Sequence, residues 1–333
     1  MKRRAVFGLI LGIAAFAAVL ATHNLTAVFG ALAGAGWQLS WVVIWRILSI
    51  FASAVSWWCL FPVSAKPPYP YLVLGRWISE AVNHLLPVAQ IGGDVVRARL
   101  AYLVAQRRGL PLSGVATAAV QVIDVTCGLS AQVIMVTIGF LLLWWRGNVA
   151  IGPALTGIAI AFVPLVLLLV VQRRDVLKGA TGILGKAGLQ HFLQSINAAG
   201  DHLAVQFSSL YRRKWVIASA IGWHLTASLL RVGETWSALW IFGHPISLTD
   251  ALLVDIMAGA ARSVAFFIPG ALGAEESGIL LICGLVGIEP SLALALALSK
   301  RARDLVLGLP GLLAWLAAER TFMAKPPVTG EQA

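Results

Sequence analysis

Long, nearly uncharged stretches of apolar residues dominate this chain and leave few folds open to it. A helix that crosses a membrane needs about 20 predominantly apolar residues. Blocks of this kind occupy 5–21, 41–62, 114–145, 150–171, 215–242 and 291–318. Strands of a transmembrane barrel alternate apolar and polar side chains instead, so the blocks exclude that class. We therefore expect an all-α, polytopic helical membrane protein.

The composition excludes two further classes. Of 333 residues, 59% are hydrophobic and only 12% are charged, whereas about a quarter are charged in soluble domains. No hydrophilic stretch is long enough for a soluble catalytic domain. The net charge of +11 comes from basic clusters at the ends of apolar blocks, which is typical of cytoplasmic loops rather than of nucleic-acid binding. Three cysteines in apolar segments and six scattered histidines predict neither disulfides nor a metal site, and we expect no cofactor.

Two further blocks do not fit a simple span. Residues 71–105 are too polar for a helix that faces lipid, and residues 250–288 are apolar but interrupted by proline, glycine and two glutamates. Irregular backbone at membrane depth is tolerated only where protein or a water-filled cavity satisfies it. We therefore expect broken or re-entrant hairpins at 71–105 and 250–288.

The distribution of basic residues predicts the orientation of the chain. Lys2, Arg3 and Arg4 place the N-terminus in the cytoplasm, and seven basic residues against two acidic ones place 172–214 there. Both termini are then cytoplasmic, the first hairpin enters from the cytoplasmic face, and the second enters from outside. Six spans with two hairpins, or eight spans with each hairpin counted as two, satisfy the charges equally well. A cleaved signal peptide is the alternative for 5–21.

We expect one integral membrane domain, 1–333, built from two halves. The first half, 5–143, contains the hairpin 71–105, and the second half, 215–320, contains the hairpin 250–288. Between them, the cytoplasmic connector 172–214 carries apolar residues at helical spacing, which predicts an amphipathic helix on the bundle or the headgroups, with a binding platform as the alternative. The stretch 23–40 lacks Lys and Arg and is expected to be an external loop.

The two hairpins share a short pattern. In each, an apolar pair precedes a proline, and a glycine and then an acidic residue follow. The corresponding positions are Pro87 and Pro269, Gly92 and Gly273, and Asp94 and Glu275. Together with the opposite entry sides, this echo indicates an inverted-topology repeat. Transporters of that design place broken helices near the membrane midplane, where helix ends contact a charged substrate.

Three motifs resemble those of a known family. They are N-x-x-L-P-x4-G-G-D-x-x-R from Asn83 to Arg97, P-G-A-L-G-A-E-E from Pro269 to Glu276, and KRARD near the last span. Together they resemble the lysylphosphatidylglycerol synthase transmembrane, or flippase-like, family over essentially the whole chain. The sequence around LPVAQIGGD is similar to that of the hopanoid-biosynthesis-associated branch. Where this chain reads PGALGAEES, the family more often has PGGLG and a single acid, so either Glu275 or Glu276 can be the functional one.

The resemblance implies a function. The family's bifunctional members carry a soluble aminoacyl-transfer domain, which this sequence lacks, so we expect only the lipid-translocating half. We expect a bacterial inner-membrane protein, not an enzyme, that moves an anionic or isoprenoid-derived lipid. The alternative is a non-transporting scaffold for lipid-biosynthesis enzymes. No P-loop, HExxH or GxSxG motif argues for catalysis.

The candidate substrate-binding residues come from the two hairpin motifs and the last span. In this interpretation Arg97 and Arg262 hold the headgroup, helped by the backbone N–H groups of the two glycines before Asp94. The alternative for Asp94 and Arg97 is a structural ion pair at i, i+3. The full set is Asn83, Pro87, Gly92, Gly93, Asp94, Arg97, Arg262, Pro269, Gly273, Glu275, Glu276, Arg301 and Arg303.

Other polar residues in the apolar blocks favour structural roles. Glu275 and Glu276 are expected to pair with Arg262, Arg301 or Arg303. Arg231 and Glu234 are spaced for an i, i+3 pair. Asp124 and His224 are expected to form hydrogen bonds between helices, with a proton relay as the alternative. Arg46 is expected to extend toward the membrane interface.

Overall fold

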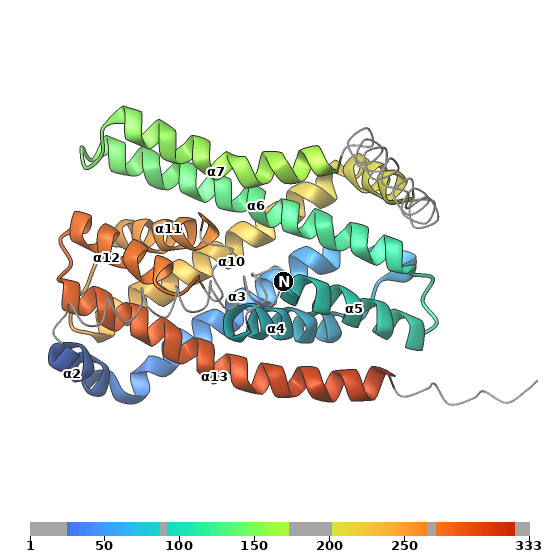
Figure 1. Ribbon diagram of the computed structural model, residues 1–333, viewed down its shortest axis with the longest axis horizontal. Coiled ribbons are helices and arrows are strands. Elements are labelled where there is room, and N and C mark those ends of the chain that lie inside the picture. The colour runs from blue at the N-terminus through green and yellow to red at the C-terminus, as the bar shows by residue number, and fades with distance from the viewer. Residues whose placement is uncertain (1–24, 87–91, 173–201, 265–270, 324–333) are drawn as a thin grey trace, which may run out of the picture.

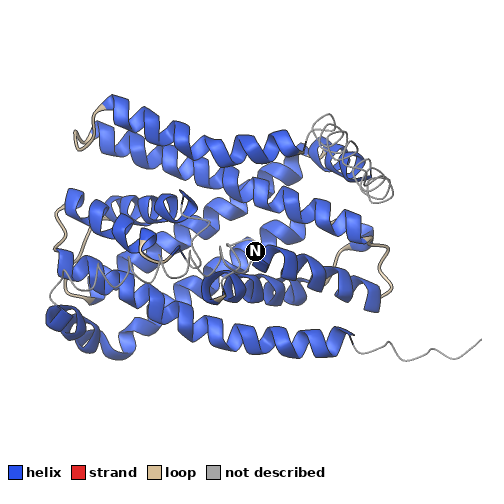
Figure 2. Ribbon diagram, in the orientation of Figure 1, coloured by secondary structure: helices blue, strands red, loops and turns tan. Residues whose placement is uncertain are grey.

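The computed structural model describes residues 25–86, 92–172, 202–264 and 271–323, and in these ranges the chain is helical and contains no strand (Figures 1 and 2). The predicted first span, 5–21, lies outside the described residues. The helices are α2 (Leu25–Ala35), α3 (Ser40–Leu60), α4 (Tyr69–Leu85), α5 (Gly92–Arg107), α6 (Gly114–Trp145), α7 (Ile151–Val171), α10 (Lys214–Ile241), α11 (Leu248–Val264), α12 (Ala274–Val286) and α13 (Pro290–Met323), with short 3-10 helices at Gly36–Leu39 and Val63–Ala65.

The long apolar blocks form long helices, as predicted. Among the described residues, four helices are long and apolar enough to cross a membrane: Gly30–Leu60, Gly114–Trp145, Ile151–Val171 and Lys214–Ile241. In α7 only Ala154 is buried, so most of the surface of that helix is available to lipid, and one side packs against α6. The predicted last span, 291–318, lies within α13, where the charged run 300–304 interrupts the apolar sequence. The chain is therefore a multi-pass helical membrane protein.

The stretch 23–40 is not a simple loop, which corrects the sequence-based expectation. It contains α2 and the 3-10 helix Gly36–Leu39, and α2 packs against α13. The absence of Lys and Arg suggested an external loop, but the sequence LTAVFGALAGA is apolar and alanine-rich. Such residues favour a helix that can bury one side against a neighbour.

Each of the two broken blocks forms a pair of helices that pack against each other. The pairs are α4 with α5 and α11 with α12 (Figure 1). The described helices end at Leu85 and Val264 and begin again at Gly92 and Ala274, whereas Pro87 and Pro269 lie outside the described residues. Re-entry from opposite faces and an inverted repeat remain predictions.

A glycine allows the two helices of each pair to approach closely. A Cβ on Gly93 of α5 would lie 2.1 Å from the backbone oxygen of Ser79 in α4. A Cβ on Gly278 of α12 would lie 2.7 Å from the Cβ of Ala261 in α11. Neither position can accept a larger residue without moving the helices apart.

Two apolar clusters lie toward opposite ends of the long helices. One includes Val42 of α3, Leu143 of α6 and Leu239 of α10, and it extends over α11, α12 and α13. The other includes Trp57 of α3 and Ile123 of α6. In Figure 1, α3 and α10 cross the middle of the molecule, α6 and α7 run along one side, and α13 along the other. Polar residues are concentrated in the region between these two clusters.

Part of the connector is described and packs on the second cluster. Residues 202–212 are helical, and Phe207 and Leu210 are buried against the cluster that contains Trp57, with Leu203 alongside. Over this stretch the apolar side of the predicted amphipathic helix contacts the bundle. The rest of the connector, 173–201, lies outside the described residues.

Candidate functional site

Polar residues are concentrated near the middle of the long helices, between the two apolar clusters. In α3 they are Arg46, Ser49 and Ser53, in α6 Asp124, and in α10 His224 through Glu234. The ends of the same helices are packed with apolar side chains. In a helix that spans a bilayer, mid-length corresponds to the membrane midplane. We therefore expect the polar band to lie near the midplane, where charge is most expensive.

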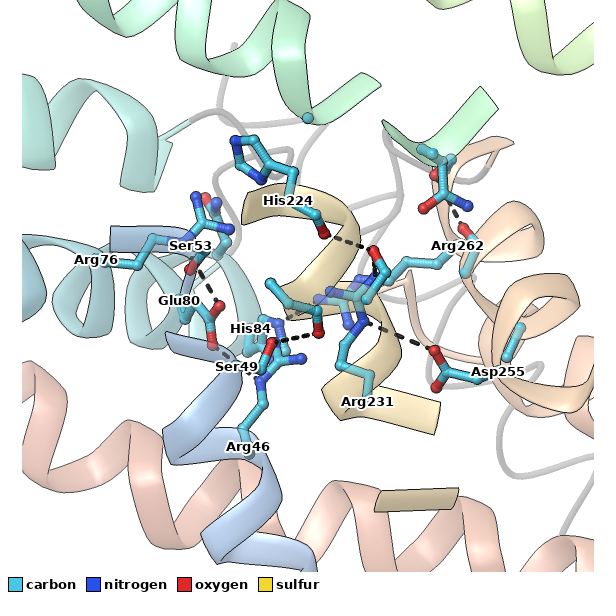
Figure 3. Close-up of a pocket in the computed structure, with 18 of the residues that line it drawn as sticks. Arg46, Ser49, Ser53, Arg76, Glu80, His84, His224, Arg231, Asp255 and Arg262 are labelled. Carbon is cyan, nitrogen blue, oxygen red and sulfur yellow. Dashed lines mark hydrogen bonds and ion pairs between the residues drawn. The ribbon is translucent and has the colours of Figure 1, made fainter. Parts of the chain in front are cut away.

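A cavity of about 320 Å³ occupies this band (Figure 3). Its walls come from α3, α4, α5 and α6 and from α10, α11, α12 and α13. The described residues that line it include seven basic ones (Arg46, Arg76, Arg97, Arg231, Arg262, Lys300 and Arg303) and six acidic ones (Glu80, Asp94, Asp124, Glu234, Asp255 and Glu275). The lining is thus strongly charged yet close to neutral overall.

Arg97 of α5 lies between two carboxylates. Its Nη2 is 2.9 Å from Asp94 Oδ1 and its Nη1 is 2.8 Å from Asp124 Oδ2. The guanidinium also lies 5.0 Å from the ring of Trp57, and the side chain is 1% exposed. The predicted i, i+3 pair is confirmed. Because two carboxylates already balance Arg97, this geometry favours the structural ion pair over a headgroup contact.

Asp124 also contacts α10 and α3. Its Oδ1 lies 3.0 Å from His224 Nε2 and accepts a hydrogen bond of 3.0 Å from the hydroxyl of Ser56. The expected hydrogen bond between the helices that carry Asp124 and His224 is confirmed. This carboxylate thereby joins α3, α5, α6 and α10 on one side of the cavity.

The two adjacent glutamates of the second motif pair with arginines, as predicted. Glu275 lies 3.4 Å from Arg262 and 3.6 Å from Arg301, and Glu276 accepts a hydrogen bond of 2.5 Å from Arg301. Glu276 also accepts a hydrogen bond of 2.8 Å from the backbone N–H of Gly273, which begins α12. Glu276 therefore holds the helix start in place, while Glu275 lines the cavity.

His84 connects the first hairpin to the second hairpin and to α13. Its Nδ1 lies 2.8 Å from Asp304, and its Nε2 contacts Arg262 Nη2. An arginine nitrogen can only donate, so Nε2 accepts, and Nδ1 carries the proton that bonds Asp304. A neutral imidazole satisfies both contacts, and the two hairpins meet through this one side chain.

Two expectations are wrong, one about an ion pair and one about the direction in which a side chain extends. Arg231 and Glu234 do not pair: Arg231 lies 3.7 Å from Asp255, and Glu234 contacts Arg303 of α13. Arg46 does not extend to the interface, because it donates a hydrogen bond of 3.0 Å to Glu80 and lines the cavity. In both cases a partner on another helix, unreadable from local spacing, decides where the side chain goes.

The backbone N–H of Gly93 is not free for a phosphate. It donates a hydrogen bond of 2.8 Å to the side-chain oxygen of Asn83. Asn83 therefore caps α5 and ties it to α4, which is a structural role. The contact between a phosphate and the backbone N–H groups of the GGD segment, which the sequence predicted, is therefore not available at Gly93, because Asn83 accepts this hydrogen bond.

The structure brings most of the predicted site residues together. Six of them (Asn83, Asp94, Arg97, Arg262, Glu275 and Arg303) line the cavity. Glu276 and Arg301 form the ion pairs behind Glu275, and Gly92, Gly93 and Gly273 lie at the helix starts that carry these residues. Whether any of the predicted residues binds a substrate stays a prediction.

Sequence reasoning left out several residues of the cavity wall. Arg76, Glu80 and His84 recur at i, i+4, which places them on one side of a helix, and that spacing signals a polar helix face. Lys300 and Asp304 have the same i, i+4 spacing in α13. The ionisable residues of the wall that were not selected are Arg46, Arg76, Glu80, His84, Asp124, His224, Arg231, Glu234, Asp255 and Lys300.

Comparison with known proteins identifies one related family. The sequence model described as "Lysylphosphatidylglycerol synthase TM region" matches residues 5–311. The match includes every helix of the cavity wall except the end of α13. Searches of the curated proteins and of the solved structures find no match.

Proposed function

The chain belongs to the lysylphosphatidylglycerol synthase TM region family, and on this premise we propose that it translocates a lipid across a bacterial inner membrane. In this proposal it acts as a flippase-like transporter rather than as an enzyme. The lipid has an anionic or isoprenoid-derived character, and its polar headgroup passes through the central cavity.

The observation that carries this proposal is the charged cavity at mid-length of the bundle. A lipid headgroup that crosses a bilayer loses its contacts with water, and a charged group at the midplane costs several kcal/mol. A cavity of about 320 Å³ lies at the lower end of the range for small-molecule sites, about 300–1,000 Å³. Its walls offer both signs of charge, so they can replace the water that the headgroup gives up.

The arrangement of the helix pairs fits alternating access. The two pairs, α4 with α5 and α11 with α12, contribute Asp94, Arg97, Arg262 and Glu275 to one cavity. In transporters with inverted repeats, one repeat rocks against the other around a fixed site. We propose that these pairs are the re-entrant elements of six or eight spans, with both chain termini in the cytoplasm.

A more specific version assigns the protein to hopanoid or related isoprenoid-lipid metabolism. It rests on the resemblance of the LPVAQIGGD segment to the hopanoid-associated branch. Deletion of the gene in its own organism, with separate analysis of inner- and outer-membrane lipids, tests it. We expect a hopanoid or related isoprenoid lipid to accumulate in the inner membrane, and an unchanged distribution would contradict this version.

Reconstitution tests translocation directly. Purified protein is placed in vesicles that carry fluorescent headgroup-labelled lipids, separately anionic, zwitterionic and isoprenoid, and a membrane-impermeant quencher reports the outer leaflet. Wild-type protein is expected to make at least one inner-leaflet lipid accessible faster than in empty vesicles. Glu275→Gln, in the cavity wall, should slow this exchange, whereas Arg99→Gln, whose side chain is 51% exposed and outside the cavity lining, should not.

The outcome also separates transport from scaffolding. If folded wild-type protein moves none of the lipids, the proposal fails and a scaffold role gains support. Affinity purification from membranes should then recover lipid-biosynthesis enzymes at constant ratio.

A further inference from the structure

Six of the seven basic residues of the cavity wall fall into two groups, and the seventh, Arg262, contacts Glu275. Arg97 and Arg303 each contact two carboxylates, Asp94 with Asp124 and Glu234 with Asp304, respectively. Their charges are fully balanced within the protein, and the two side chains are 1% and 3% exposed. We therefore assign structural roles to these two arginines.

The other group shares carboxylates. Glu80 has two cationic neighbours, Arg46 at 3.0 Å and Arg76 at 3.7 Å. Asp255 likewise has Lys300 at 3.0 Å and Arg231 at 3.7 Å. In each case the nearer cation hydrogen-bonds the carboxylate and the farther one does not, so the farther cation is the less tightly engaged of the two.

Arg76 and Arg231 are the more distant cations, and both line the cavity. Their side chains are 22% and 29% exposed, more than those of the other five basic residues in the wall, which are at most 18% exposed. The Nε of Arg76 is buried and donates no hydrogen bond, and Arg231 donates one of 2.9 Å to the Ser228 hydroxyl. A buried donor without an acceptor is costly, so this arrangement favours an added acceptor.

The two triads line the same cavity. Figure 3 shows Arg46 and Glu80 around the same space, with Arg76 on one side and Arg231 on the other. An anion in that space would face the two less tightly engaged arginines, Arg76 and Arg231. Its carboxylate neighbours are already engaged by Arg46 and Lys300.

We propose that Arg76 and Arg231 form a binding site for the phosphate of a lipid headgroup. Guanidinium groups match the oxygens of a phosphate and can each donate two parallel hydrogen bonds to it. The proposal rests on the proposed lipid translocation and names the headgroup chemistry. It assigns the anion to these two arginines in place of Arg97, which the structure has already neutralised.

Binding of a short-chain lipid in a phosphate-free maltoside detergent tests the site. Calorimetry compares dioctanoyl phosphatidate, dioctanoylglycerol, which lacks the phosphate, and inorganic phosphate. We expect phosphatidate to bind at least about tenfold more tightly than either of the others, because the site takes a phosphate joined to acyl chains. Equal affinity for dioctanoylglycerol overturns the phosphate contact, and equal affinity for inorganic phosphate overturns the lipid assignment.

Substitutions locate the contact. Arg76→Gln and Arg231→Gln should each weaken phosphatidate binding about tenfold or more, as loss of a charge-assisted hydrogen bond does. Arg76→Lys and Arg231→Lys keep the charge beside Glu80 and Asp255, so they test the site even if a glutamine variant does not fold, and they should weaken binding severalfold. The control Arg99→Gln should bind like wild type. Affinity within about twofold of wild type in every folded Arg76 and Arg231 variant overturns the proposal.

The same variants separate this site from the proposed function. If phosphatidate binds and the substitutions weaken it, but no labelled lipid crosses the vesicle membrane, the site stands and translocation fails. If labelled lipid crosses at the wild-type rate in both glutamine variants, translocation stands and the site is overturned.

Discussion

Replacement of Arg97 by methionine should destabilise the protein rather than only weaken a ligand contact. Methionine keeps the length and much of the volume of the side chain but removes its charge. Asp94 and Asp124, at 2.9 and 2.8 Å from the guanidinium, then face each other's negative charge without the cation between them. We expect the free energy of unfolding to fall by about 3–5 kcal/mol, the usual cost of removing one member of a buried ion pair.

The remaining contacts of the two carboxylates place the loss toward the lower end of that range. Asp124 keeps His224 and Ser56, and Asp94 keeps the side-chain amide of Gln121 at 3.2 Å. The attraction of two unit charges at about 4 Å is about 4 kcal/mol at an effective dielectric constant of 20, and much of that is offset by the desolvation of the charges. We therefore expect a loss near 3 kcal/mol.

Unfolding of purified protein in mixed micelles of mild and denaturing detergent, followed by tryptophan fluorescence, measures this loss. The double variant Arg97→Met with Asp124→Asn provides the internal control. Because it removes a carboxylate together with its cation, its loss should be smaller than the sum of the two single losses by about 0.5–3 kcal/mol.

One result would refute the reasoning. If Arg97→Met unfolds within about 1 kcal/mol of wild type while lipid binding is lost, the two carboxylates do not depend on Arg97. The guanidinium would then be available to a headgroup, as the motif alone suggested.

Three further predictions follow from the same structure. Gly93→Ala should lower the unfolding stability by at least about 1–3 kcal/mol, the cost of overpacking, whereas Gly222→Ala, with nothing within 4 Å of the new Cβ, should be neutral or slightly stabilising; equal stability of the two variants would contradict the close approach. Asp94→Asn should slow lipid exchange in vesicles while leaving stability within about 1 kcal/mol of wild type, because Asp124 still balances Arg97; a parallel loss of folded protein would show a bracing role instead. Topology reporters fused after Ala333 and inserted in the 244–247 loop before α11 should report opposite sides of the membrane, and matching sides would rule out both the six-span and the eight-span scheme.

The helices could be predicted from the sequence because hydropathy is a local property. The blocks 114–145, 150–171 and 215–242 correspond to α6, α7 and α10 within one residue at each end. The stretch 23–40 could not be placed in the same way, because its lack of charge fits an external loop and a buried helix equally well. Contact with α13 decides between them.

The candidate site was predictable only where partners are close in the sequence. Asp94 and Arg97 are three residues apart, and their pairing follows from the helical repeat. Arg231 and Glu234 have the same spacing, yet Glu234 contacts Arg303, 69 residues away. Local spacing states which pairs are possible, and only the packing of α10 against α11 and α13 decides which of them form.

The close approach at Gly93 and Gly278 has a mechanical consequence. Each glycine allows its helix to pack closely against its partner, α5 against α4 and α12 against α11. Sliding or separation of the two helices of a pair would break that contact. We therefore expect each pair to move as a unit, and a change in the shape of the cavity to come from movement of the pairs against each other or against the other helices of the wall. His84 of α4 contacts Arg262 of α11, so this contact has to change whenever the two pairs move relative to each other.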